Sequence, residues 1–121
     1  MLTDDAGITP LNRRFFGKDR PTDVISFALD TLPGEPAGLR GEIFVNVERA
    51  RLVGRRPDPS SRELALYIAH GFNHLSGATD HTPRERAAMR RRELAWLRRA
   101  ARLGYLQGLV SACVARRRSS S

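Results

Sequence analysis

The sequence predicts a single domain of the α/β (α+β) class, with strands in the first half of the chain and helices in the second. Residues 23–29 and 42–47 are short runs of β-branched and aromatic residues, a composition typical of strands. From residue 62 onward, apolar residues recur at helical spacing. A length of 121 residues suits one domain that buries a core.

Turn-forming segments separate the predicted strands. Residues 8–21 are rich in such residues, so we expect no regular element there. The run over 23–29 predicts a buried strand. Residues 31–40 contain two prolines and two glycines and predict a loop before the second strand. A short helix is expected over residues 48–53.

Helical signals dominate the second half. The sequence PDPSS at 57–61 predicts a break, with a serine available as the N-cap of the helix that starts at Arg62. Gly77 suits the left-handed position just after that helix. The sequence TPRE at 82–85 supplies an N-cap, a proline at the first helical position and a glutamate three residues after the cap. It predicts a second helix that ends at about Arg102.

Positive charge is concentrated in the C-terminal third. The net charge is +8, with a balance of +9 over residues 84–118 and −1 over residues 1–83. A basic segment favours a polyanionic partner, RNA or DNA. The chain has twenty arginines and one lysine, which a codon bias explains equally well. We divide the chain into a domain over 1–103 and a basic, flexible tail over 104–121.

The composition also bears on the compartment. No run approaches eighteen apolar residues, which predicts no membrane span. The first ten residues are acidic and lack the apolar core of a signal peptide. Cys113 is the only cysteine, which excludes an internal disulfide framework. We therefore expect a cytoplasmic protein without a membrane partner.

The segment HGFNHLSGATDH at 70–81 contains all three histidines of the chain. His70 and His74 are four residues apart, which on a helix places their Cβ atoms about 5–6 Å from each other on one face. After the helix ends, His81 can return as a third metal ligand. Three protein ligands leave a fourth position open, as in catalytic zinc sites. The alternative is an ordinary polar stripe followed by a helix cap.

Three blocks of the sequence, in this order, resemble the YbeY endoribonucleases, also called rRNA maturation factors. The resemblance extends over about residues 8–97. The blocks are Leu11-Asn12 together with GKDRPTDVISF at 17–27, then Gly41-Glu42-Ile43, and finally the histidine segment.

The resemblance implies a mixed β-sheet packed with helices, with the metal-binding helix beneath the sheet. It implies one Zn²⁺ ion and a single-strand-specific endoribonuclease that acts in 16S rRNA 3′-end maturation and ribosome quality control. Its partners would be rRNA and the small ribosomal subunit. Carried over by position, His70, His74 and His81 would be the zinc ligands, and would act catalytically through the water that the zinc activates.

The sequence departs from the family pattern at several positions. Phe16 stands where the family usually has an arginine, and Asn73 where it has a leucine. The loop after His74 is one residue longer than usual, so the family's third-ligand offset falls on Asp80. We favour His81 as the ligand and expect Asp80 to support an imidazole or the turn.

The arginine that the family uses has no direct replacement. Arg13, Arg14 or Arg20 would supply the charge, and Arg91 and Arg92 are further RNA-binding candidates. The family's first strand and first helix also have no counterpart before the first block, which predicts an N-terminally shortened member.

Two other functions stay open. One is a catalytically impaired ribosome- or RNA-binding factor, favoured by Phe16 and opposed by the retained histidines. The other is a metal-dependent hydrolase of another substrate, such as a peptide. Gly71 opposes a peptidase, because H-E-x-x-H metalloproteases carry their glutamate at that position. A glycine inside a helix costs about 0.5–1 kcal/mol relative to alanine, and close approach of another backbone or a substrate would explain it.

Overall fold

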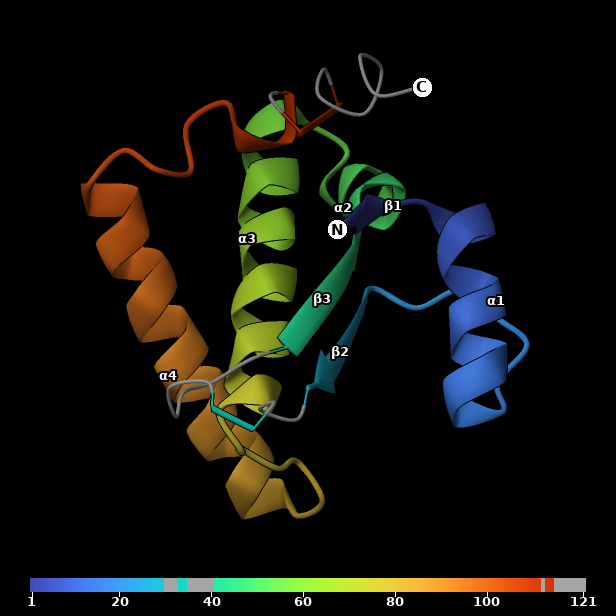
Figure 1. Ribbon diagram of the computed structural model, residues 1–121. Coiled ribbons are helices and arrows are strands. Elements are labelled where there is room, and N and C mark those ends of the chain that lie inside the picture. Colours follow the sequence, from blue (N-terminus) through green and yellow to red (C-terminus); the bar gives the residue numbers. More distant parts are fainter. Residues whose placement is uncertain (30–32, 35–40, 112, 115–121) are drawn as a thin grey trace.

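The computed structural model describes residues 1–29, 33–34, 41–111 and 113–114, and Figure 1 shows their arrangement. The predicted α/β (α+β) class is confirmed, because these residues form a mixed three-stranded sheet packed with helices. No helix among them is both long and apolar enough to cross a membrane. The elements along the chain are β1 (Leu2–Thr3), α1 (Asp5–Phe16), β2 (Val24–Ala28), β3 (Gly41–Asn46), α2 (Val47–Gly54), α3 (Pro57–Leu75) and α4 (Pro83–Arg102).

β3 lies at the centre of the described sheet, between β1 and β2. It runs parallel to β1, with Leu2 opposite Val45, and antiparallel to β2, with Val24 opposite Val45. The sheet is therefore mixed, as the family resemblance implied. The loop expected over 31–40 lies outside the described residues, apart from a turn at 33–34.

Helices cover both faces of the sheet (Figure 1). α3 lies against the face that carries Val24 and Ile43, because a Cβ atom on Gly71 of α3 would lie 2.9 Å from a methyl group of each. α1 lies against the opposite face, where the rings of Phe15 and Phe27 have centroids 4.4 Å apart. α4 packs against α3 on the side away from the sheet, so the layers run α1, sheet, α3, α4.

The core lies where the sheet, α2 and α3 meet. Its buried members are Val45, Val47, Ala50, Leu64, Tyr67 and Val110.

Val110 comes from the segment that the sequence analysis assigned to a flexible tail. Its backbone N–H donates to Ser61 Oγ at 3.0 Å, and Leu109, Cys113 and Val114 pack against the same core. These apolar residues gain burial by folding back onto α3. The division of the chain at residue 103 stays a prediction, and residues 115–121 lie outside the described part.

Most predicted elements are confirmed. The strands over 23–29 and 42–47 are β2 and β3, and the short helix over 48–53 is α2. α4 has the predicted bounds. Its N-cap is Thr82, whose Oγ1 accepts the Glu85 N–H at 3.1 Å.

The expectation of irregular structure over residues 8–21 is wrong, because α1 covers much of this segment. Asp4 caps its start by accepting the Gly7 N–H at 2.8 Å. Gly17 ends it in the left-handed conformation, with φ of 67°. Ile8, fully buried, anchors the helix. Residues that favour turns therefore serve here as the caps of a helix.

The expected break over 57–61 is also wrong, because α3 starts at Pro57 and not at Arg62. Proline suits the first position of a helix, where its missing N–H costs no hydrogen bond. Ser60 and Ser61 do not cap the helix and are instead buried within its first turns.

Candidate metal centre and adjoining cleft

The last turns of α3 carry the predicted metal motif and lie close against the sheet. A side chain at position 71 would meet methyl groups of Val24 and Ile43, so the close neighbours of Gly71 are side chains of β2 and β3 and not the backbone or substrate that was expected. Gly77 has the predicted left-handed conformation, with φ of 96°, and turns the chain toward α4.

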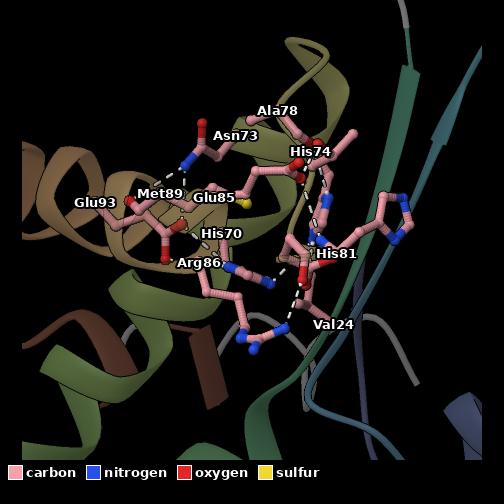
Figure 2. Close-up of polar contacts among 12 residues, drawn as sticks. Val24, His70, Asn73, His74, Ala78, His81, Glu85, Arg86, Met89 and Glu93 are labelled. Atoms are coloured by element: carbon pink, nitrogen blue, oxygen red, sulfur yellow. Dashed lines mark hydrogen bonds and ion pairs between the residues drawn. The ribbon is translucent and has the colours of Figure 1, made fainter. Parts of the chain in front are cut away.

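His70 and His74 face each other at this end of α3 (Figure 2). Their Nε2 atoms are 3.1 Å apart. His70 Nδ1 lies 3.1 Å from both carboxylate oxygens of Glu93, and His74 Nδ1 lies 3.2 Å from the carbonyl oxygen of Ala78. A carboxylate oxygen and a carbonyl oxygen accept hydrogen bonds, so the tautomer that fits both contacts has the proton of each ring on Nδ1.

With this tautomer, two neutral rings direct their Nε2 lone pairs at each other. Lone pairs 3.1 Å apart repel, and a cation between them, either a shared proton or a metal ion, removes that repulsion. Two nitrogens bound to one tetrahedral zinc at about 2.0–2.1 Å are ~3.3 Å apart, close to the observed separation. The pair therefore has the geometry of two ligands of one metal.

Asp80 is the third group at this site. Its Oδ2 lies 3.7 Å from His74 Nε2, and donor atoms of His70, His74 and Asp80 all lie within 4.8 Å of one another. The sequence analysis favoured His81 instead. The structure does not bring His81 into this cluster, and Figure 2 shows its ring directed away from His70. Asp80, which was expected to play a supporting part, supplies the third donor atom of the cluster, and which of the two residues binds a metal stays a prediction.

Contacts of the loop after α3 explain this exchange. The Ala78 N–H donates to the Asn73 carbonyl at 3.1 Å, and the Glu85 carboxylate accepts the Thr79 hydroxyl and the His81 N–H. Both hydrogen bonds lower the pKa of Glu85, and the bond from the Thr79 hydroxyl has the larger effect. The carboxylate is therefore ionised at neutral pH. With both flanking residues tied to α4, the intervening Asp80 side chain turns toward the histidines.

The donor set fits a catalytic zinc. Two imidazole nitrogens and one carboxylate oxygen are common zinc ligands, and three protein ligands leave one position for substrate or solvent. The same nitrogen and oxygen donors also bind other divalent first-row metals, so the site indicates the class of ion rather than one element.

Glu93 and Asn73 form a buried network behind the histidines that the sequence analysis missed. Glu93 is only 4% exposed, and Asn73 Nδ2 donates to its Oε2 at 2.9 Å. Arg92 Nη1 in turn donates to Asn73 Oδ1 at 2.8 Å. A signal was present in the sequence, because Met89, Glu93 and Leu97 are spaced by four residues and place one acid in a buried apolar stripe of α4.

A cleft of about 930 Å³ opens beside His70 and Asp80. None of its arginines forms an ion pair with an acid among the residues that the structure describes. Its acids have internal contacts, such as the 2.8 Å bond from the Val24 N–H to Asp23 Oδ1. Four arginines line the cleft, and Nη1 of one of them, Arg86, also donates to the Asp80 carbonyl oxygen at 3.1 Å. The four are Arg20, Arg49, Arg86 and Arg90.

The predicted RNA-binding arginines are spread over the molecule, and among them only Arg20 lines this cleft. Arg13 is paired with Asp19 at 2.6 Å, and Arg14 lies over the Phe15 ring. Arg91 and Arg92 are on α4 but do not line the cleft, and Arg92 donates to Asn73. The sequence analysis therefore pointed to Arg20 and to the basic character of α4, but it missed Arg86 and Arg90, the α4 arginines that line the cleft.

Comparison with known proteins gives one family. The family model described as Endoribonuclease YbeY matches residues 1–101. Endoribonuclease YbeY of Rhodopirellula baltica is 42% identical over 99 residues, which cover 78% of this chain and 48% of that protein. The Moorella thermoacetica protein of the same name is 43% identical over 105 residues, which cover 79% of this chain and 67% of that protein. Endoribonuclease YbeY of Anaeromyxobacter dehalogenans is 36% identical over 118 residues, which cover 94% of this chain and 55% of that protein. The chain thus spans about half to two thirds of the length of these relatives.

Proposed function

We propose that this chain, which belongs to the endoribonuclease YbeY family, is a metal-dependent endoribonuclease that cuts single-stranded RNA. The observation that carries the proposal is the convergence of the His70 and His74 Nε2 atoms, 3.1 Å apart, with Asp80 at the edge of a cleft lined by arginines. Such a cleft offers a metal site and cations for phosphates in one place.

When bound, a zinc ion supplies Lewis-acid polarisation of a phosphoryl oxygen and a nucleophile at neutral pH. The residues of the chain prepare its site. The Glu93 carboxylate and the Ala78 carbonyl hold protons on Nδ1 of the two histidines, which leaves each Nε2 free to bind metal. The buried network behind them fixes the ring of His70 before any ligand arrives.

The cleft residues bind and orient the RNA. Arg86 and Arg90 are four residues apart on α4, so both reach the same face of the cleft. Arg20 and Arg49 approach it from other elements. Burial raises the pKa of Tyr67, which also lines the cleft, so its hydroxyl remains a donor at neutral pH.

The finer assignment follows from the family resemblance. We propose zinc as the metal, rRNA of the small ribosomal subunit as the substrate, and 16S rRNA 3′-end maturation and ribosome quality control as the process. The basic C-terminal third and the arginines of the cleft support an RNA partner.

The peptidase alternative loses support from the packing of α3. Position 71 is where an H-E-x-x-H enzyme carries its general base, and here even a methyl group would meet Val24 and Ile43. The alternative of an impaired RNA-binding factor still rests on Phe16, which stands at the position of the family's usual arginine.

Cleavage of a labelled single-stranded RNA, with and without a chelator, tests the proposal. We expect cleavage that the chelator abolishes, that added zinc restores, and that the His70→Ala and His74→Ala variants lack. Binding of RNA by the metal-loaded protein without cleavage would establish the impaired binding factor instead. Cleavage of an unstructured peptide but not of RNA would identify a peptidase.

A further inference from the structure

A second hollow, of about 360 Å³, lies beside the histidine pair. His74 lines this groove, whereas His70 lines the cleft with the arginines, and Thr22 lines both. The two hollows therefore meet at the candidate metal site. The groove is formed by the end of α1, by β2 and by the end of α3, and its other lining residues include Phe16, Lys18, Ser26 and Leu75.

Phe16 gives this groove an aromatic wall. It is the last residue of α1, and it is 54% exposed although its ring is apolar. Its ring lies nearly parallel to that of Phe27, with an interplanar angle of 14° and centroids 6.4 Å apart, so one side of the ring is supported by the protein. Lys18, two residues further on, places a cation at the same groove. An aromatic ring beside a cation is the combination that single-stranded nucleic acid uses for stacking and for phosphate contact.

The edge of β2 gives the groove hydrogen-bonding groups. The Asn46 N–H donates to the Asp23 carbonyl at 2.9 Å, so bonded pairs of the β2–β3 ladder recur at every second residue from Asp23. The backbone groups of Val24, Ser26 and Ala28 therefore point away from β3, and β2 is an outer strand of the described sheet. Among these groups, the Val24 N–H already donates to Asp23 Oδ1 at 2.8 Å. These same three residues line the groove.

We infer that this groove is a nucleobase subsite, which holds one base of a single-stranded RNA beside the phosphate to be cleaved. The inference rests on the proposed function and names a substrate contact for it. Phe16 stacks on the base, the outer backbone groups of β2 meet the edge of the base, and Lys18 faces an adjoining phosphate. The neighbouring phosphates continue into the cleft with the arginines.

The test measures RNA binding apart from cleavage, so it uses protein from which a chelator has removed the metal. The ligands are short single-stranded RNAs that carry the fluorescent base 2-aminopurine at successive positions. Phe16→Leu keeps the apolar contact with Phe27 but has no aromatic face, so we expect it to weaken binding roughly 5- to 150-fold. Phe16→Trp should retain binding. Phe15→Leu is the matched control, because Phe15 is similarly exposed, at 49%, also contacts Phe27, and does not line the groove. Circular dichroism checks that each variant is folded.

A second arm links the residue to one base. Replacing the responding nucleotide by an abasic one should weaken binding to the wild-type protein and have no further effect on Phe16→Leu. Equal binding by Phe16→Leu and wild type, or equal losses in Phe16→Leu and Phe15→Leu, would overturn the subsite. Displacement from the groove by an extended peptide, with RNA binding independent of Phe16, would assign the β2 edge to a peptide and also overturn it. Phe16-dependent binding without cleavage by the metal-loaded protein would refute the proposed catalytic function and leave the subsite standing.

Discussion

At the residue scale, the partners of Nδ1 decide what His70 and His74 can do. A histidine pair four residues apart on a helix is common, and it binds metal well only when both rings present a deprotonated nitrogen to the same point. The Glu93 carboxylate at 3.1 Å and the Ala78 carbonyl at 3.2 Å impose that state on the two rings. The candidate metal site is therefore arranged by an acid on α4 and a backbone carbonyl in the next loop.

The third ligand is tested by comparing Asp80→Ala with His81→Ala. Asp80 contributes an oxygen to the cluster and His81 does not, so Asp80→Ala should bind zinc more weakly while His81→Ala keeps near wild-type affinity. Zinc titration against a competing chelator measures both. Loss of zinc in His81→Ala with retention in Asp80→Ala would restore His81 as the ligand, and tight zinc in both would contradict a three-ligand site.

A second prediction concerns the Glu93 carboxylate, which orients the ring of His70. Glu93→Ala should lower metal affinity about 10- to 100-fold, because His70 loses the acceptor that orients it. Glu93→Gln keeps one oxygen for the two donors, His70 and Asn73, and should fall in between. The exposed Glu42 provides the control Glu42→Gln. Visible spectra of the cobalt-loaded proteins report the ligand geometry, and unchanged affinity and spectra in Glu93→Ala would contradict this role.

The sequence was sufficient for His70 and His74, because helical spacing alone places them together. It was not sufficient to choose which of two adjacent residues, Asp80 or His81, lies beside them. That choice depends on the contacts that Glu85 makes with the loop, and these exist only once α4 packs beside α3. Glu93 was missed for a related reason, since only its burial distinguishes it from a surface acid.

At the element scale, α3 carries the site because it lies close to the sheet. Gly71→Ala adds a methyl group 2.9 Å from methyl groups of Val24 and Ile43. Overpacking of this kind costs about 1–3 kcal/mol, against a gain of about 0.5–1 kcal/mol in helix propensity. We expect a lower free energy of unfolding in urea and weaker zinc binding.

A double-mutant cycle with Val24→Ala separates overpacking from other effects. Val24→Ala removes one of the two methyl contacts, so the two changes together should destabilise by less than the sum of the single changes. An additive result, or a Gly71→Ala variant more stable than wild type, would mean that the contact is not tight.

Helices whose capping residues and prolines agree on where they start could be predicted, and helices in which these residues conflict could not. The sequence at 82–85 gives the start of α4 correctly, because N-cap, proline and glutamate agree. α1 was missed because it contains Pro10, and an internal proline normally argues against a helix. Capping by Asp4 and Gly17 and burial of Ile8 outweigh that signal, and burial is not visible in so short a segment of sequence.

At the scale of the whole molecule, α4 is basic along its length, and two of its arginines, Arg86 and Arg90, line the cleft. Arg86→Ala combined with Arg90→Ala should reduce the salt dependence of single-stranded RNA binding by up to about 1.4 in logarithmic slope, since each phosphate contact releases about 0.7 counterion. Arg98→Ala with Arg99→Ala removes the same charge from the same helix but outside the cleft lining. Equal slopes for the two double variants would show that the cleft does not hold the phosphates.

The central claim is that a metal at His70, His74 and Asp80 drives cleavage of RNA held in the adjoining cleft. The most direct test removes metal from the protein and restores it stepwise, while bound metal and cleavage of a single-stranded RNA are measured on the same sample. We expect no cleavage by the metal-free protein, a rise in proportion to bound metal, and saturation near one ion per chain. Cleavage that persists without metal, or full occupancy by one zinc ion without cleavage of bound RNA, would contradict the account.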